Sequence, residues 1–326
     1  MSVLFIAAAA VQAASAPSIE ITNFAGEVRI EPGAALGVRV DRPDAEGPVE
    51  ITETADGLII DGGRDMRRWR CRGGWREDRV GPDRRSRRAF DELPLLVITS
   101  PEPAALDLDE SIVRAEAGDL ASLDLDLAHC GAFEAGDVAG DAVIALSGST
   151  DVSLDDVAGG VTIALSGAGG VSVASSAGAE VSASGSGGAD LGDMAGPLTV
   201  RLSGSGDVRA GEAASVDART SGSGDITVGA VVGGINFSSS GSGDLSAERM
   251  NGALDAALGG SGDVAIEAGR AEPFQVRATG SGGVDFGGTA VNVSVRLTGS
   301  GDVEVAAVEG DQDLRTTGSG DFEVGG

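Results

Sequence analysis

The sequence predicts an all-β protein whose main part is a right-handed parallel β-helix of about ten or eleven coils, each about nineteen residues long. Three observations lead to this fold: a glycine-rich motif at nearly constant spacing, an alternation of apolar and polar side chains through each copy, and an unusual composition. Of the 326 residues, 53 are Gly and only 3% are aromatic. Such a chain buries small aliphatic side chains between neighbouring repeats rather than large rings in one globular centre.

The recurring motif is Gly-Ser-Gly-Asp or a close variant of it. Its first glycine stands at positions 148, 167, 185, 204, 222, 241, 260, 280, 299 and 318, so successive copies are 18 to 20 residues apart. A weaker copy surrounds Gly131, and residues 106–113 resemble a degenerate first coil. This regularity is typical of a solenoid, in which each coil pairs in register with the next at a spacing of about 4.8 Å.

The residues on both sides of each motif alternate between apolar and polar types, as in the segment from Leu198 to Ala210. An alternation with period two predicts strands with one buried and one solvated face. We therefore expect aliphatic side chains of successive coils to share one interior, among them Leu202, Ile226, Leu245 and Val264. The motif glycines have the inward parity, which we interpret as a sharp bend over a narrow core where a side chain would collide.

Stacking of the coils places the motif aspartates in a row, here named the aspartate ladder. Its members are Asp207, Asp225, Asp244, Asp263, Asp302 and Asp321, and Gly283 stands at the equivalent position of one coil. Two interpretations stay open. The carboxylates cap backbone N–H groups at the corners, or the row binds Ca²⁺ or another cation. No organic cofactor is predicted, and no metal site other than this candidate row.

The first sixteen residues resemble a secretory signal peptide, although no basic residue precedes their apolar run. That run, Val3–Val11, is too short to span a bilayer, and Ala14-Ser15-Ala16 fits a signal-peptidase site. The alternative is a buried N-terminal strand or helix. We expect an exported protein in the periplasm, at the outer membrane or outside the cell, with no transmembrane span. In such a compartment Cys71 and Cys130 either form a disulfide or stay free, and their spacing does not decide which.

After the signal peptide, the chain divides into an irregular β portion at residues 17–92 and the β-helix at residues 93–326. The first portion holds an arginine-rich segment at residues 64–88, with 11 Arg against 4 acidic residues and both tryptophans of the chain. Arginine interleaved with tryptophan suits a polyanion, such as an anionic envelope glycan or lipid. The residues proposed for this role are Arg67, Arg68, Trp69, Arg70, Arg72, Trp75 and Arg76. Alternatively, the segment folds back onto the acidic rod or forms a flexible loop.

The chain resembles the head GIN domain family, whose members are described as autotransporter adhesin-like. The resemblance rests on Asn23–Gly33, Asp56–Ile60, Val97–Pro101 and the Gly-Ser-Gly-Asp coils. It implies an exported or surface β-helical protein that works in adhesion or in the cell envelope without catalysis. The chain departs from the family pattern by its extra coils and its arginine-rich segment.

The net charge of −28 argues against nucleic acid as a partner, because a polyphosphate requires a basic surface. The single histidine, His129, argues against a Ser/His triad or a histidine metal cluster. We therefore expect an adhesive or structural binding module and no enzyme. The alternatives are a cation-binding module and a carbohydrate-active β-helix enzyme. An uncovered final coil at Asp321–Gly326 further predicts end-to-end self-association.

Overall fold

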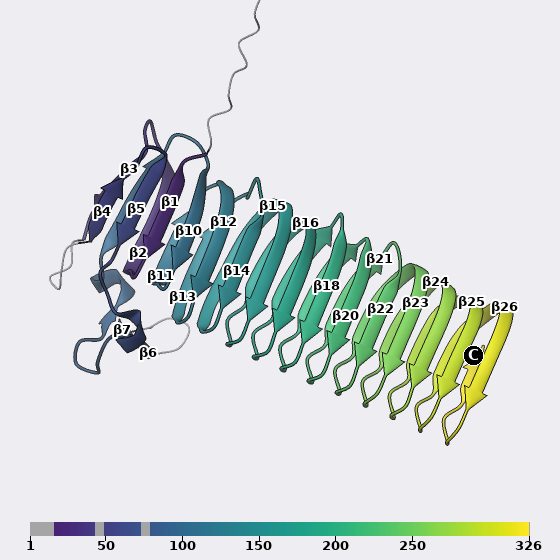
Figure 1. Ribbon diagram of the computed structural model, residues 1–326. Helices are drawn as coiled ribbons and strands as arrows, with labels where there is room; N and C mark the ends of the chain where they lie inside the picture. Colours follow the sequence, from purple (N-terminus) through teal and green to yellow (C-terminus); the bar gives the residue numbers. More distant parts are fainter. Residues whose placement is uncertain (1–15, 43–48, 73–78, 326) are drawn as a thin grey trace, which may run out of the picture.

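The computed structural model describes residues 16–42, 49–72 and 79–325. Residues 1–15, which make up nearly all of the predicted signal peptide, lie outside the described residues. The chain forms a parallel β-solenoid of about 12 turns with a period of about 19 residues, which confirms the predicted fold class. Figure 1 shows the turns stacked into a rod, with residues 64–72 and 79–92 beside its N-terminal end.

Each turn contributes one strand to each of two walls, and every strand in a wall pairs in parallel with the strand one turn away. Strands confined to the first wall are β5 (Gly57–Asp61), β1 (Ser18–Thr22), β10 (Ala104–Asp109), β12 (Leu120–Leu127), β14 (Ala142–Leu146), β18 (Pro197–Leu202), β20 (Ser215–Thr220) and β22 (Ile235–Ser239). Strands confined to the second wall are β9 (Leu95–Ser100), β2 (Ala25–Pro32), β11 (Ile112–Ala117), β13 (Cys130–Ala135), β17 (Ala189–Met194), β19 (Val208–Ala213), β21 (Ile226–Val231) and β27 (Phe322–Val324).

Six long strands pass from the second wall into the first without a break. They are β15 (Ser149–Leu165), β16 (Val171–Ala183), β23 (Leu245–Leu258), β24 (Val264–Ala278), β25 (Val284–Leu297) and β26 (Val303–Thr316). In each of them the residues between the two walls return the chain to the next turn. The return is extended in these six strands because its backbone also pairs with the neighbouring turn, with only local shifts of register.

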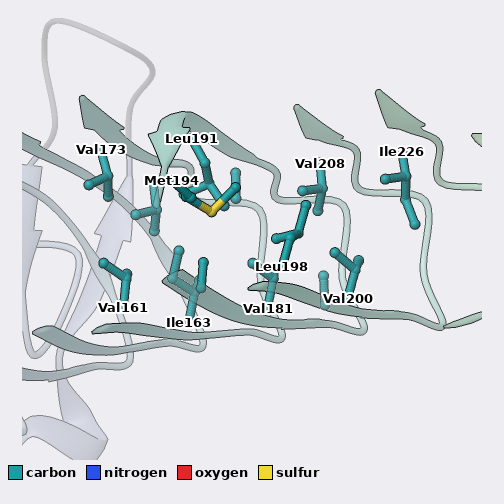
Figure 2. Close-up of a cluster of buried hydrophobic side chains, with 14 of the residues drawn as sticks. Val161, Ile163, Val173, Val181, Leu191, Met194, Leu198, Val200, Val208 and Ile226 are labelled. Atoms are coloured by element: carbon teal, nitrogen blue, oxygen red, sulfur yellow. The ribbon is translucent and has the colours of Figure 1, made fainter. Parts of the chain in front are cut away.

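The interior of the rod is one continuous aliphatic core. Leu202, Ile226, Leu245 and Val264 are each at most 2% exposed and belong to the same cluster, which confirms the predicted inward parity. In Figure 2, Leu191 and other side chains of the second wall face side chains of the first wall across this core. Stacked coils thus bury their aliphatic surface against one another, which stabilises each by about 25 cal/mol per Å² of apolar area.

The motif glycines are required by a close approach between neighbouring coils. A Cβ atom on Gly204 would stand 2.0 Å from the carbonyl oxygen of Gly185, one coil earlier. That oxygen accepts a hydrogen bond of 3.0 Å from the amide of Ser205. The obstacle is therefore the backbone of the adjacent coil, and not the core, as the sequence interpretation assumed.

The N-terminal portion forms turns of the same solenoid, in an order that the sequence did not predict. In the first wall β1 lies between β5 and β10, and in the second wall β2 lies between β9 and β11. The proposal that residues 106–113 form the first coil is therefore wrong, because two further layers precede it. These layers also bring the turn number above the ten or eleven expected. Strands from both sides of residue 92 alternate in the same sheet.

Two antiparallel strands cover the outermost N-terminal layer. Strand β4 (Glu50–Glu53) pairs with β5, and strand β3 (Gly37–Val40) pairs with β9. Covering the edge strands of a sheet satisfies their free backbone groups and discourages pairing with other chains.

Candidate functional site

The arginine-rich segment folds into a small lobe, here named the arginine lobe and defined as residues 64–72 and 79–92. It contains the 3₁₀ turns η1 (Met66–Arg68) and η2 (Phe90–Glu92) and a three-stranded antiparallel sheet. The strands of that sheet are β6 (Arg70–Arg72), β7 (Arg79–Gly81) and β8 (Arg88–Ala89). The described part of the segment is thus folded, and the flexible-loop interpretation is wrong for it.

The lobe has its own apolar core, separate from that of the rod. Met66, Trp69, Val80, Phe90 and Leu93 are buried there. Three residues of the second wall complete the same cluster, namely Ala25, Ile112 and Cys130. The lobe therefore packs on the second wall of the first turns through apolar contacts.

A disulfide joins Cys71, in the middle of β6, to Cys130, at the start of β13. This settles the choice that the sequence left open between paired and free thiols. His129, next to the bridge, is half-buried. Burial lowers the pKa of its imidazole, a hydrogen bond with the backbone of Met66 opposes that shift, and the charge of Arg70 adds to it.

Trp69 supports the lobe from within. Its side chain is 5% exposed, and the guanidinium of Arg64 lies 5.1 Å from its ring centroid and 5.9 Å from that of Phe24. Arg64 also donates a hydrogen bond of 3.0 Å to the carbonyl of Ala25. Cation–π contacts of this kind contribute about 0.5–2 kcal/mol. Trp69 is thus engaged by Arg64 and by the lobe core, and its part in binding a polyanion stays a prediction.

The arginines predicted to bind a polyanion lie at the lobe surface. Arg67 and Arg68 are exposed on η1, and Arg70 and Arg72 are exposed on β6. Trp75 and Arg76 lie outside the described residues. The structure adds Arg79, which the sequence analysis did not single out and which pairs directly opposite Arg72. The alternation of Arg70-Cys71-Arg72 was a signal for this strand, but its pairing partner is set only by the fold.

Most arginines of the rod form ion pairs, whereas four arginines of the lobe have no carboxylate partner among the described residues. Seven of the eight arginines from Arg201 to Arg315 lie within 4 Å of a carboxylate, and the exception among the described residues is Arg249. In the described part of the lobe Arg68 pairs with Asp65 at 3.2 Å, whereas Arg67, Arg70, Arg72 and Arg79 lie within 4 Å of no carboxylate of the described residues. A chain with 51 acidic residues thus keeps four exposed lobe arginines without a carboxylate partner among the described residues.

The aspartate ladder lies on the second wall and joins neighbouring coils. The Oδ1 atom of one aspartate accepts a hydrogen bond from the backbone amide at the equivalent position of the next coil, at 2.7–3.1 Å. The capping interpretation is thereby confirmed for five of the six aspartates, Asp207 to Asp302, each of which accepts a hydrogen bond from one corner N–H group. Cation binding by the ladder stays a prediction, which a rise of the melting temperature with Ca²⁺ would support. In the ranges that the structure describes, no group of three or more His, Cys, Asp and Glu residues is arranged to hold a metal ion.

A second acidic surface lies on the first wall near the N-terminal end, where Glu20, Asp107 and Asp124 face outward from adjacent strands beside the pair Asp109 and Asp126. Burial, and then the charge of Asp124, raise the pKa of Asp107. Burial, and then the charge of Asp109, raise the pKa of Asp126. Ionisation of these two carboxyl groups therefore opposes folding.

Asp126→Asn is expected to raise the melting temperature at pH 7, with a gain of at most about 0.5 kcal/mol because the site is largely solvated. A carboxyl whose folded pKa is raised binds more protons in the folded state, so its unfavourable contribution is complete above the folded pKa. The contribution disappears below the unfolded pKa of about 3.9. Melting curves of both proteins from pH 3 to pH 8 should therefore converge at the acidic end. A variant that is less stable at pH 7 would contradict this account.

A groove of about 640 Å³ runs along the first wall beside the corners, across several turns. Serine hydroxyls of successive coils line it, for example Ser166, Ser184 and Ser203. Its two arginines are already engaged, Arg201 with Glu180 at 2.5 Å and Arg219 with Asp217 at 3.0 Å. The groove therefore presents hydroxyl groups and arginines that are already neutralised by carboxylates. It would attract a charged ligand less strongly than the arginine lobe.

The fold and the lobe define a class of protein: an acidic parallel β-solenoid with a folded arginine-rich lobe at its N-terminal end. Residues 232–326, which form the last coils, match the family model described as "Putative auto-transporter adhesin, head GIN domain". This confirms the predicted resemblance over those residues, whereas the N-terminal segments that also carried it lie outside the match. No curated protein and no solved structure matches the chain. None of the helices in the described residues is long and apolar enough to cross a bilayer.

Proposed function

We propose that this chain is an exported cell-envelope or surface protein that works by binding, without catalysis, and that its arginine lobe binds polyanions. The observation that carries the proposal is the separation of charge: rod arginines are almost all ion-paired, whereas Arg67, Arg70, Arg72 and Arg79 have no carboxylate partner among the described residues. An anionic glycan or lipid of the envelope fits this surface. The acidic rod keeps the chain soluble by self-repulsion and repels polyanions elsewhere.

Three further observations support export and an adhesive role. The first sixteen residues have the pattern of a signal peptide. The disulfide between Cys71 and Cys130 suits an oxidising compartment, such as the periplasm or the cell exterior. The family that matches the last coils is described as adhesin-like. Fractionation of cells that express the chain, with mass spectrometry of the mature N-terminus, tests the location; a cytoplasmic protein that retains Met1 would overturn export.

Binding to anionic surfaces is expected to depend on the lobe and to weaken with salt. Mature protein should co-sediment with phosphatidylglycerol-containing vesicles or bind a polyanionic glycan at 50 mM salt. The triple variant Arg67→Gln, Arg70→Gln, Arg72→Gln should lose at least about tenfold in affinity, because each exposed cation adds about 1 kcal/mol near an anionic surface. Affinity should also fall between 50 and 200 mM salt, since counterion release drives the association.

Arg249→Gln is the matched control, because Arg249 lies on the rod and likewise has no ion pair among the described residues. It should bind as the wild type does. An equal loss of binding free energy per charge removed in the two variants would mean that net charge, and not the lobe, governs binding. Failure of the wild type to bind any anionic vesicle or glycan would overturn the proposed function.

A further inference from the structure

We propose that Arg72 and Arg79 form a site for a phosphate monoester, the terminal phosphate group of a sugar, lipid headgroup or free phosphate ion. This inference rests on the proposed function, since it assigns the anion chemistry and the two central residues of the same surface. It goes further in predicting selectivity for a tetrahedral dianion over carboxylates.

The geometry comes from the pairing of β6 with β7. In their antiparallel register Arg72 pairs with Arg79, and Cys71 pairs with Val80. Cys71 is directed inward to its disulfide and Val80 is fully buried. Because side chains alternate along a strand, Arg72 and Arg79 both lie on the outer face. Their Cβ atoms are therefore about 5 Å apart, as for any directly opposite cross-strand pair.

Two like charges at opposite positions of a ladder repel each other, and this chain resolves such repulsion elsewhere with an acid. On the rod Arg201 and Arg219 are direct neighbours in the register, and each pairs with its own carboxylate, Glu180 or Asp217. Among the described residues neither Arg72 nor Arg79 has such a partner. The lobe thus holds two neighbouring cations without the carboxylates that pair with the corresponding arginines of the rod. An anion from outside the protein would take the place of those carboxylates.

The surroundings hold this pair in place before any ligand arrives. The disulfide at Cys71 anchors the middle of β6 to β13. Arg70 donates hydrogen bonds to the carbonyls of Arg67 at 2.6 Å and Trp69 at 2.7 Å, which fixes the start of the strand. Next to β7, the Nε atom of Arg87 is buried without a hydrogen-bond partner among the described residues. A site whose side chains are already ordered loses less conformational entropy when a ligand binds.

The chemistry of the pair favours a phosphate monoester. Such a group carries a charge of about −1.5 to −2 near pH 7 and three terminal oxygens. Two guanidinium groups match that charge, and each can present two parallel N–H donors to a pair of these oxygens. A carboxylate offers one charge and two oxygens, so it can satisfy only one of the two arginines in this way.

Calorimetric titration of the mature, disulfide-bonded protein tests the site with inorganic phosphate, glucose 1-phosphate and acetate at equal ionic strength. Phosphatidic acid vesicles against phosphatidylcholine vesicles provide the membrane arm. We expect both phosphate ligands to bind at least about tenfold more tightly than acetate, and Arg72→Gln or Arg79→Gln to remove that difference. If the protein binds phosphatidic acid vesicles as well as the free phosphate ligands, the phosphate monoester group itself is what the site recognises. Vesicle binding without free-ligand binding would assign recognition to the membrane surface and overturn the site.

Thermal melting separates this site from a structural role of the two arginines. In phosphate-free buffer Arg72→Gln or Arg79→Gln should melt no lower than the wild type, because each removes a repulsion. Phosphate should then stabilise the wild type and Arg249→Gln but neither lobe variant. If both lobe variants retain wild-type affinity for phosphate, the inference fails. If the wild type binds carboxylated and phosphorylated polymers equally, the inference fails and the proposed function stands.

Discussion

Gly204→Ala is expected to destabilise the rod by about 2–4 kcal/mol. The new Cβ would stand 2.0 Å from the carbonyl oxygen of Gly185 and 2.6 Å from that of Ser184. Both atoms are backbone, and the nearer one accepts the hydrogen bond from the amide of Ser205, so a shift of the Gly185 carbonyl opens that bond. Two neighbouring coils must therefore separate locally.

Urea denaturation followed by circular dichroism measures this loss. Because each coil contacts only its neighbours, the defect should also divide the cooperative unit and broaden the transition. Ser205→Ala is the control in the same corner, since its side chain is exposed and should change stability by less than about 0.5 kcal/mol. A Gly204→Ala protein that unfolds at the wild-type midpoint would show that the corners relax more easily than their contacts imply.

Replacing both cysteines, Cys71→Ser with Cys130→Ser, is expected to loosen the arginine lobe and leave the rod folded. The bridge joins residues 59 positions apart, and the loop-entropy model assigns such a crosslink about 4 kcal/mol. The rod does not depend on it, because its coils are held by their own ladders and core. The lobe core contains few residues, so it relies on the bridge and on the contacts of Trp69.

Limited digestion with trypsin measures this local opening. All 23 basic residues are Arg, so the protease cleaves only there. Cleavage after Arg67 and Arg68 should become at least about tenfold faster in the double variant, while a rod fragment persists. Binding of phosphate should weaken in parallel, because Cys71 lies between Arg70 and Arg72. Unchanged protection of the lobe would mean that its apolar contacts suffice without the bridge.

The rod was predictable because its determinants are local and repeated. The two-residue alternation around Leu202 and Ile226 specifies which face is buried, and the nineteen-residue spacing specifies what stacks on it. The sequence predicted correctly that a side chain at Gly204 would collide, but it assigned the collision to the core. The neighbour of Gly204 is a carbonyl of another coil, and only a three-dimensional register shows which atom that is.

The N-terminal layers were not predictable in the same way. Strands β1 and β2 lie between strands that follow them in the chain, and β3 and β4 reverse direction to cover the edge. Without a repeat, short alternating runs such as Ile19–Ile21 indicate a strand, but they do not indicate which other strand it pairs with. The same reason applies to Arg79, whose place opposite Arg72 depends on a pairing across a separate small sheet.

By itself the sequence determined the parallel β-solenoid, its inward residues, its acidic character and the existence of a cationic segment, because these follow from periodicity and composition. The tertiary structure alone decided that Trp69 is buried, that Cys71 bonds Cys130, and that Arg72 and Arg79 lie opposite each other with no carboxylate partner among the described residues. These features depend on contacts between segments far apart in the chain. Such contacts are selected by the packing of the whole fold, and no local pattern encodes them.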